Sequence, residues 1–301
     1  LAGAGFSAQA TQSGITLEFS GYHQSLLPLI DQVVSELPIP LIDEGTWDRL
    51  ANLKMQELAA LDSTRPFNRL FDEMTAGLMP LAYPKTELKT AFMEIDRSVF
   101  HQYQTAFFSG LKAEMLLHGP VSVDEGAELL ARIAGSLPLD PATGEVVPTT
   151  TPWTQASELQ FTYPHPDEAA VVAFVDDETS PERRILNQLA GNLIEAPFYT
   201  ALRTERQLGY ITFATAFPLV NTPVLAGAIQ SPVANPDVLV DAMRAEFEAF
   251  PEQVRAMPAE QFTAAKRSLI NELNNPPQTQ GELSSNLWQT IGLQRPFNDR
   301  I

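Results

Sequence analysis

An internal repeat is the feature of this 301-residue sequence that most restricts its fold. In each half, a strand-like segment leads into an amphipathic helix, a proline break and then a second helix. The two second helices match at an offset of 215 residues, with Trp47 opposite Phe262 and Leu58 opposite Leu273. Such repetition indicates two copies of one supersecondary unit. The sequence therefore predicts two homologous α+β domains, each with a mostly antiparallel sheet and helices packed on one face.

A turn-rich connector separates the two copies. Residues 141–157 contain Pro141, Pro148 and Pro152 together with three successive threonines, a composition typical of loops. We therefore expect one domain at 1–140 and a second at 158–301. Aligning the copies leaves the first without its opening strands and the second without its final elements, so we expect both domains to be truncated at the chain ends.

Hydrophobic periodicity predicts the elements within each copy. The predicted helices cover, in chain order, residues 26–37, 44–61, 66–79, 86–108, 123–133, 181–194, 198–207, 237–250, 259–274 and 280–291. The predicted strands cover residues 15–22, 112–118, 158–163, 169–175, 210–217 and 223–230.

Composition excludes several classes of function. The chain has no cysteine, which removes disulfides, thiol catalysis, thiolate zinc sites and iron–sulfur clusters. Its formal net charge is -18, from 19 Lys and Arg against 37 Asp and Glu. Because no basic cluster is present, we expect no nucleic-acid partner and no anionic membrane partner.

The four histidines do not form a recognisable metal motif; they are His23, His101, His118 and His165. Two zinc motifs, His-Glu-x-x-His and its inverted form His-x-x-Glu-His, are both absent. His165 begins the nearest approach to the inverted form, but Ala169 replaces the second histidine and Pro166 would break a helix. We therefore predict a loop there, and a packed or capping role for His118. Nucleophile elbows and phosphate-binding loops are also absent, so the chain shows no complete active site of its own.

The segment 197–210, where a helix passes into a strand, is the best candidate for a functional site. Alternation along the strand places Ile211 and Phe213 on one face and Tyr210 on the other. If the apolar face takes the helices, Tyr210 points to the open face, and Arg203 can present its guanidinium to the same space. The alternative is a structural role, in which Arg203 pairs with a local glutamate and Tyr210 packs at the strand end.

The same segment resembles a signature of the insulinase or pitrilysin (M16) family of zinc metallopeptidases. That signature is Pro-Phe followed by Leu-Arg-Thr-x-x-Gln-Leu-Gly-Tyr, and it is matched by Pro197, Phe198, Leu202, Arg203, Thr204, Gln207, Leu208, Gly209 and Tyr210. The resemblance extends over nearly the whole chain, through Ile229-Gln230-Ser231 to Arg295-Pro296-Phe297. It implies that the chain is most of the third and fourth of four homologous domains, which form the C-terminal half.

In that family, two halves enclose peptide substrates, and the zinc with its ligands lies in the first domain. The resemblance therefore implies no cofactor in this chain, zinc in the N-terminal half, that half as a partner, and peptides or small proteins as substrates. It implies that Arg203 and Tyr210 assist catalysis by stabilising the substrate and the tetrahedral intermediate, while Tyr199 and Phe198 contact the substrate. A periplasmic location is expected, with the cytoplasm as the alternative. A second hypothesis is an inactive scaffold or binding subunit of the same fold.

Overall fold

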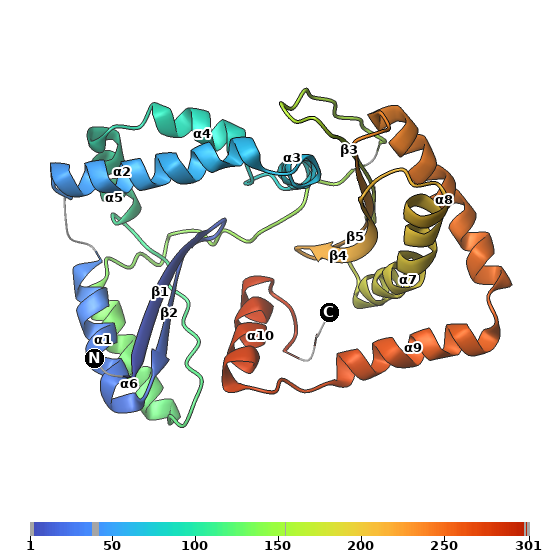
Figure 1. The fold of residues 1–301 in the computed structure, drawn as a ribbon. Helices are drawn as coiled ribbons and strands as arrows, with labels where there is room; N and C mark the ends of the chain where they lie inside the picture. Colours follow the sequence, from blue (N-terminus) through green and yellow to red (C-terminus); the bar gives the residue numbers. More distant parts are fainter. Residues whose placement is uncertain (1–2, 38–41, 154, 298, 300–301) are drawn as a thin grey trace. The chain divides into compact units, whose positions relative to one another are not determined.

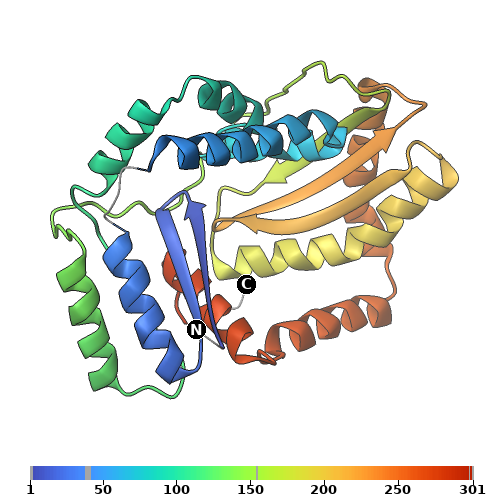
Figure 2. The same cartoon turned by 60° about the vertical axis from the view of Figure 1, so that its left-hand side comes forward.

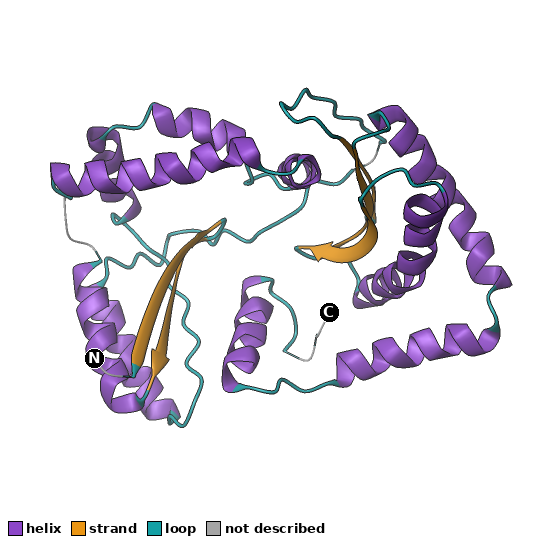
Figure 3. Ribbon diagram, in the orientation of Figure 1, coloured by secondary structure: helices purple, strands orange, loops and turns teal. Residues whose placement is uncertain are grey.

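The computed structural model describes residues 3–37, 42–153, 155–297 and 299. The chain divides into two compact units. Unit 1 comprises Leu1–Ala59, Thr86–Pro148 and Thr279–Trp288, and unit 2 comprises Ala60–Lys85, Thr149–Gln278 and Gln289–Ile301. Both contain helices and antiparallel strands, which confirms the predicted α+β class (Figure 3). Since each unit draws on distant parts of the sequence, the contiguous domains 1–140 and 158–301 remain a prediction.

Unit 1 contains a β-hairpin with two helices beside it. The hairpin consists of β1 (Ala4–Thr11) and β2 (Gly14–Gly21). Helices α1 (His23–Glu36) and α6 (Val123–Ser136) bury a small apolar cluster, made of Ile30, Val34 and Leu129. The strand predicted at 15–22 is confirmed by β2. The sequence prediction missed β1, because its alternating residues are mostly small or polar and carry a weak strand signal.

The remaining helices of this half follow the predicted order. They are α2 (Glu44–Ala59), α4 (Lys85–Met93), α5 (Arg97–Phe107) and, near the chain end, α10 (Gln280–Gly292), which begins in unit 1 and ends in unit 2. The short 3-10 turn η1 (Ala60–Ser63) follows α2 and belongs to unit 2. The predicted helical stretch 86–108 forms two helices, since the Asp96 carboxylate caps α5 by accepting a hydrogen bond from the Val99 amide at 2.8 Å.

Unit 2 is built on a three-stranded antiparallel sheet with the order β3-β5-β4. The strands are β3 (Glu168–Val175), β4 (Ile211–Leu219) and β5 (Thr222–Ser231). The helical elements of this unit are α3 (Pro66–Leu78), α7 (Pro181–Tyr199), the π-helix η2 (Thr200–Glu205), α8 (Pro236–Ala256) and α9 (Ala259–Asn274). Figures 1 and 2 show α7 and α8 against one side of this sheet.

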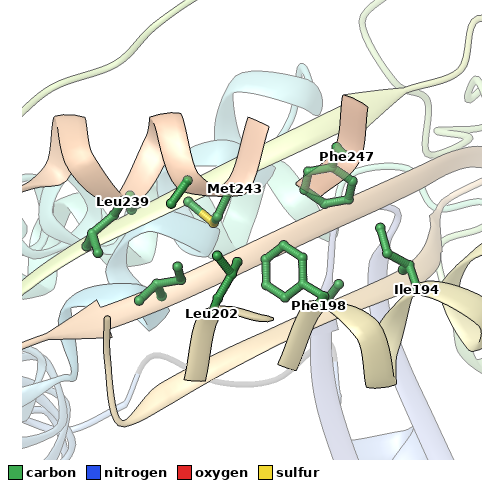
Figure 4. Close-up of a cluster of buried hydrophobic side chains, with 10 residues drawn as sticks. Ile194, Phe198, Leu202, Leu239, Met243 and Phe247 are labelled. Atoms are coloured by element: carbon green, nitrogen blue, oxygen red, sulfur yellow. The ribbon is translucent and has the colours of Figure 1, made fainter. Parts of the chain in front are cut away.

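The main apolar core lies between the sheet and the pair α7 and α8. Figure 4 shows the side chains that fill it, which include Ile194, Phe198, Leu202, Leu239, Met243 and Phe247. The Phe198 ring lies 5.4 Å from the Phe247 ring, measured between centroids. Gly227 of β5 makes room for both, because a Cβ there would lie 2.7 Å from Phe198 Cζ. This core fixes the end of α7 against the sheet.

The other face of the sheet is covered by α3. The rings of Phe67 and Phe71 lie 5.8 and 6.1 Å from the ring of Phe213 in β4. Thr212 and Ala214, which alternate with Phe213, are buried on the side of α7 and α8. The predicted alternation agrees with this arrangement, but helices cover both faces: α3 covers the face of Phe213, and α7 and α8 cover the other. The condition attached to Tyr210, that the apolar face takes the helices and leaves the other face open, is therefore not met.

Two predicted strands are absent from the described residues. Residues 112–118 form no ladder; the neighbouring Leu111 makes one isolated bridge to Leu139. Residues 158–163 are irregular as well. Side chains tie the latter segment down, since the Tyr163 hydroxyl donates to the carbonyls of Leu61 and Thr64, at 3.0 and 2.7 Å. Apolar alternation alone predicted these strands, but neither segment lies beside a partner strand.

Candidate functional site

The site begins where α7 changes into the π-helix η2 at Thr200. The Arg206 amide donates to the Ala201 carbonyl at 3.0 Å, and the Leu208 amide donates to the Leu202 carbonyl at 2.9 Å. Each hydrogen bond of a π-helix spans one residue more than in an α-helix, so a π-turn rotates the side chains that follow it, and such turns are frequent at functional sites. Because Leu202 is fully buried in the main core, this turn is firmly anchored.

Gly209 connects the π-helix to β4 and approaches the neighbouring strand closely. A Cβ at this position would lie 2.4 Å from the Gln230 carbonyl oxygen and 2.6 Å from Ile229 Cγ2. Only glycine fits without displacing the backbone. The Tyr210 amide, next in sequence, donates to the same Gln230 carbonyl at 3.2 Å. The glycine of the sequence signature therefore sets the position of Tyr210.

Arg203 lies in the π-helix and is half-buried. Its guanidinium has no hydrogen-bond or ion-pair partner among the described residues. The structural alternative, an ion pair with a local glutamate, is thus not found in the described part of the chain. A guanidinium prefers bidentate anionic or carbonyl partners, and this one remains available for such a contact.

Tyr210 belongs to a polar cluster of three side chains, which also includes Asp167 and Gln230. The Tyr210 hydroxyl donates to Asp167 Oδ2 at 2.6 Å. Gln230 Nε2 donates to the same Oδ2 at 2.9 Å and to the Tyr210 hydroxyl oxygen at 2.5 Å. The Tyr210 side chain remains 49% exposed, so its ring is held at one end and open to solvent elsewhere.

Hydrogen bonds in this cluster shift two pKa values. The bond from Tyr210, followed by the one from Gln230, stabilises the carboxylate and lowers the pKa of Asp167 below its ordinary value. The same Tyr210–Asp167 bond raises the pKa of Tyr210, because ionising the phenol would break it beside a negative charge. Burial also raises the Tyr210 pKa, whereas Gln230 and the positive charge of Arg65 lower it. At neutral pH the pair is a carboxylate and a neutral phenol.

His165 supports the loop that carries Asp167. The Asp167 amide donates to His165 Nδ1 at 3.0 Å. The ring stacks on Tyr163 with 6.5 Å between centroids. The segment is a loop up to the start of β3, as predicted. His165 therefore helps to order the loop that carries Asp167.

The other two predicted site residues differ in exposure. Tyr199, at the end of α7, leaves 49% of its side chain exposed, whereas Phe198 is fully buried in the main core. Among the described residues, no hydrogen bond joins Arg203 to the cluster of Tyr210. Phe198 supports the site through packing, and substrate contacts by either residue stay a prediction.

Asp167 and Gln230 are the residues that the sequence analysis missed. Asp167 was considered only as part of a failed metal motif, and Gln230 only as part of a matching stretch. The available signal was Gln230 at the end of an otherwise apolar predicted strand. A glutamine that such a strand buries needs hydrogen-bond partners for its amide. Neither pairing could be predicted, since Asp167 and Gln230 lie 63 residues apart in the chain.

Metal ligation does not fit the described residues, which contain no group of three or more His, Asp or Glu side chains placed to hold an ion. His118 has the packed role that we predicted: its Nδ1 lies 2.7 Å from the Ser284 hydroxyl, in unit 1. The same hydroxyl donates to the Gln280 carbonyl at 2.9 Å. In the same described residues, no helix is long and apolar enough for a membrane span.

Comparison with known proteins gives a consistent family assignment. Residues 189–288 match the family model described as PQQ synthase PqqF-like, C-terminal lobe domain 4. Human insulin-degrading enzyme is 22% identical over 308 residues, and Protease 3 of Escherichia coli K12 is 25% identical over 297 residues. These alignments cover 99% and 95% of this chain but only 30% of each relative. The chain is therefore similar to the C-terminal lobe of an M16 protein.

Solved structures agree with this M16 assignment at the level of the fold. Pitrilysin superposes with a TM-score of 0.81 at 21% identity. The superposition covers 99% of this chain and 32% of the pitrilysin chain. The periplasmic protease PqqL of Escherichia coli superposes with a TM-score of 0.67 at 14% identity, over 99% of this chain and 33% of the PqqL chain. An M16 inactive domain from Pseudomonas fluorescens gives 0.65 at 16% identity, with 97% of this chain and 72% of that one covered. The M16 lobe thus spans about a third of the longer relatives.

Proposed function

We propose that this M16 lobe is the C-terminal half of a zinc-dependent metalloendopeptidase, that it encloses peptide substrates, and that it contributes Arg203 and Tyr210 to the active site. The observation that supports this proposal is the local geometry of η2 and Gly209. It leaves the Arg203 guanidinium without a partner among the described residues and anchors the Tyr210 hydroxyl with its ring half exposed. A fixed cation and a phenolic hydroxyl can stabilise the negative charge that develops on a carbonyl oxygen during peptide hydrolysis.

The zinc ion of such an enzyme has no place among the described residues of this lobe, which lack a group of three suitable ligands. We therefore place the zinc and its ligands in the N-terminal half, which is the proposed partner of this lobe. The isolated lobe should then cleave no peptide. PqqL is a periplasmic protease, and we propose the periplasm for this protein too, with the cytoplasm as the alternative.

The decisive experiment is substitution of Tyr210 by Phe in the full-length protein. Removing one hydrogen-bond donor to a developing oxyanion lowers kcat by roughly 10²–10³-fold in other hydrolases. We expect a loss of that order in kcat/KM on a peptide substrate, with zinc content unchanged and only a small decrease in stability from the lost hydrogen bond to Asp167. Arg203→Ala should give a comparable loss.

Matched controls are available in the same unit. Arg206→Ala removes an exposed arginine three residues beyond Arg203, and Tyr163→Phe removes a hydroxyl that bonds only to backbone carbonyls. Both control variants should keep kcat/KM within about threefold of the wild-type value. Full activity of Tyr210→Phe would refute the role that we assign to Tyr210.

The second candidate is an inactive scaffold or binding subunit, and one comparison favours it: the Pseudomonas fluorescens relative is described as an M16 inactive domain. The two hypotheses differ in the N-terminal half. An intact His-x-x-Glu-His motif and zinc stoichiometry near one per full-length chain would support the enzyme. A full-length protein that binds no zinc would support the scaffold.

A further inference from the structure

The cluster of Asp167, Tyr210 and Gln230 contains a buried polar atom without a partner. Gln230 is fully buried on the middle strand β5, and its Oε1 accepts no hydrogen bond among the described residues. A buried, unsatisfied carbonyl costs about 1–3 kcal/mol. A fold selected only for stability would avoid this cost with an apolar residue at this position.

The orientation of the Gln230 amide explains why the cost is tolerated. Its Nε2 reaches two acceptors at once, Asp167 Oδ2 at 2.9 Å and the Tyr210 hydroxyl oxygen at 2.5 Å. Turning the amide over would place its oxygen against the Asp167 carboxylate and would lose both bonds. The amide thus satisfies Tyr210 and Asp167 and leaves its own oxygen unpaired. Unsatisfied groups of this kind concentrate at functional sites.

The two partners of Tyr210 do different things. Gln230 holds the phenolic oxygen from a rigid, fully buried position, independently of where the phenolic proton points. Asp167 Oδ2 accepts a hydrogen bond from the phenolic hydroxyl, with 2.6 Å between the two oxygens, and the Asp167 side chain is only 14% exposed. Rotation of the hydroxyl about its C–O bond can redirect the proton towards a substrate oxygen while Gln230 keeps the oxygen in place.

We propose that Gln230 and Asp167 are positioning residues for Tyr210: they fix its hydroxyl oxygen and keep its proton ready for a peptide carbonyl. This inference rests on the function proposed above for Tyr210. Neither residue touches the substrate, so both act through the phenol. Positioning of a catalytic group within fractions of an ångström has a large effect on rate.

The test uses the full-length protein with Gln230→Met and Asp167→Ala, each alone and each combined with Tyr210→Phe. We expect each single variant to lower kcat/KM by about tenfold, the loss typical of a hydrogen bond to a charged or reacting group. If both residues act through Tyr210, neither change should lower kcat/KM further in the Tyr210→Phe background. Gln230→Met should change the unfolding temperature little, because removal of the unpaired Oε1 offsets the loss of the two hydrogen bonds from Nε2.

Asp176→Ala is the matched control for Asp167→Ala. These two aspartates flank β3 at its opposite ends, and Asp176 pairs with Arg183 at 2.8 Å, away from Tyr210. We expect Asp176→Ala to leave kcat/KM unchanged. Should Asp167→Ala fail to fold, Asp167→Asn replaces it, because its amide oxygen can still accept from Tyr210 while the charge is lost. In that variant the alkaline titration of Tyr210, read as tyrosinate absorbance, should move to lower pH.

The outcomes separate this inference from the proposed function. Full activity of Tyr210→Phe would overturn both. An inactive Tyr210→Phe together with fully active Gln230→Met and Asp167 variants would overturn the positioning role alone. Losses that multiply in the double variants would also overturn it, because the residues would then act independently of Tyr210.

Discussion

The hydrogen bond between Tyr210 and Asp167 links stability to pH in two opposite directions. The pKa of Asp167 is lowered in the folded state, so the unfolded chain binds more protons as the pH falls below about 4. The pKa of Tyr210 is raised, so above about pH 10 the unfolded chain loses its phenolic proton first. The bond therefore contributes stability between these limits. That contribution is lost as the pH falls through the folded pKa of Asp167 or rises through that of Tyr210.

This linkage predicts the behaviour of Tyr210→Phe in unfolding experiments. The difference in unfolding free energy between the wild-type lobe and the Phe variant should be constant from about pH 6 to 9 and should shrink towards both extremes. Chemical denaturation at several pH values measures it, and subtracting the two proteins removes the contribution of the other carboxylates. A difference that stays constant down to about pH 3 would show that the Asp167 carboxylate is not linked to Tyr210.

At the scale of elements, the π-helix η2 and the turn at Gly209 determine where Arg203 and Tyr210 lie. Gly209→Ala should destabilise unit 2 by about 1–3 kcal/mol, the usual cost of overpacking, because its Cβ would lie 2.4 Å from the Gln230 carbonyl. It should also shift the Tyr210 titration. Gly292→Ala is the matched control. Gly292 is the last residue of α10, and a Cβ added there would have no atom within 4 Å, so this variant should not be overpacked. Chemical denaturation and tyrosinate absorbance check both variants, and an unchanged Gly209→Ala protein would contradict the close approach.

The sequence predicted most elements but not which faces they cover. Helices and strands with strong periodicity were found, among them α7, which the Ser180 hydroxyl caps by accepting a hydrogen bond from the Arg183 amide. Periodicity could not show that α3 packs on β4, because that contact joins residues about 140 positions apart, as between Phe71 and Phe213. For the site, the sequence signature identified Arg203 and Tyr210 as candidates. The partners of Tyr210 come from other strands and loops, which only the folded chain brings together.

At the scale of the whole molecule, the compact units and the predicted domains disagree about residues 60–85. The prediction assigns them to the domain at 1–140, whereas they lie in unit 2. There, Phe67 and Phe71 of α3 cover the sheet face that carries Phe213. A domain boundary near residue 158 would therefore cut through a packed interface. The packing predicts that the fragment 158–301 exposes an apolar sheet face that the fragment 60–301 covers.

These two fragments provide the test. Burying a large apolar side chain contributes roughly 1.5–3 kcal/mol, and Phe67 and Phe71 are half-buried. We therefore expect 158–301 to be less stable than 60–301 by about 3 kcal/mol in denaturant unfolding, and to bind a hydrophobic dye. The Phe71→Ala variant of 60–301 should have a stability between those of the two fragments, because it removes part of the contact between α3 and the sheet. Equal stability of the fragments would favour the contiguous domain at 158–301, and α3 would then be an accessory to the sheet instead of part of its core.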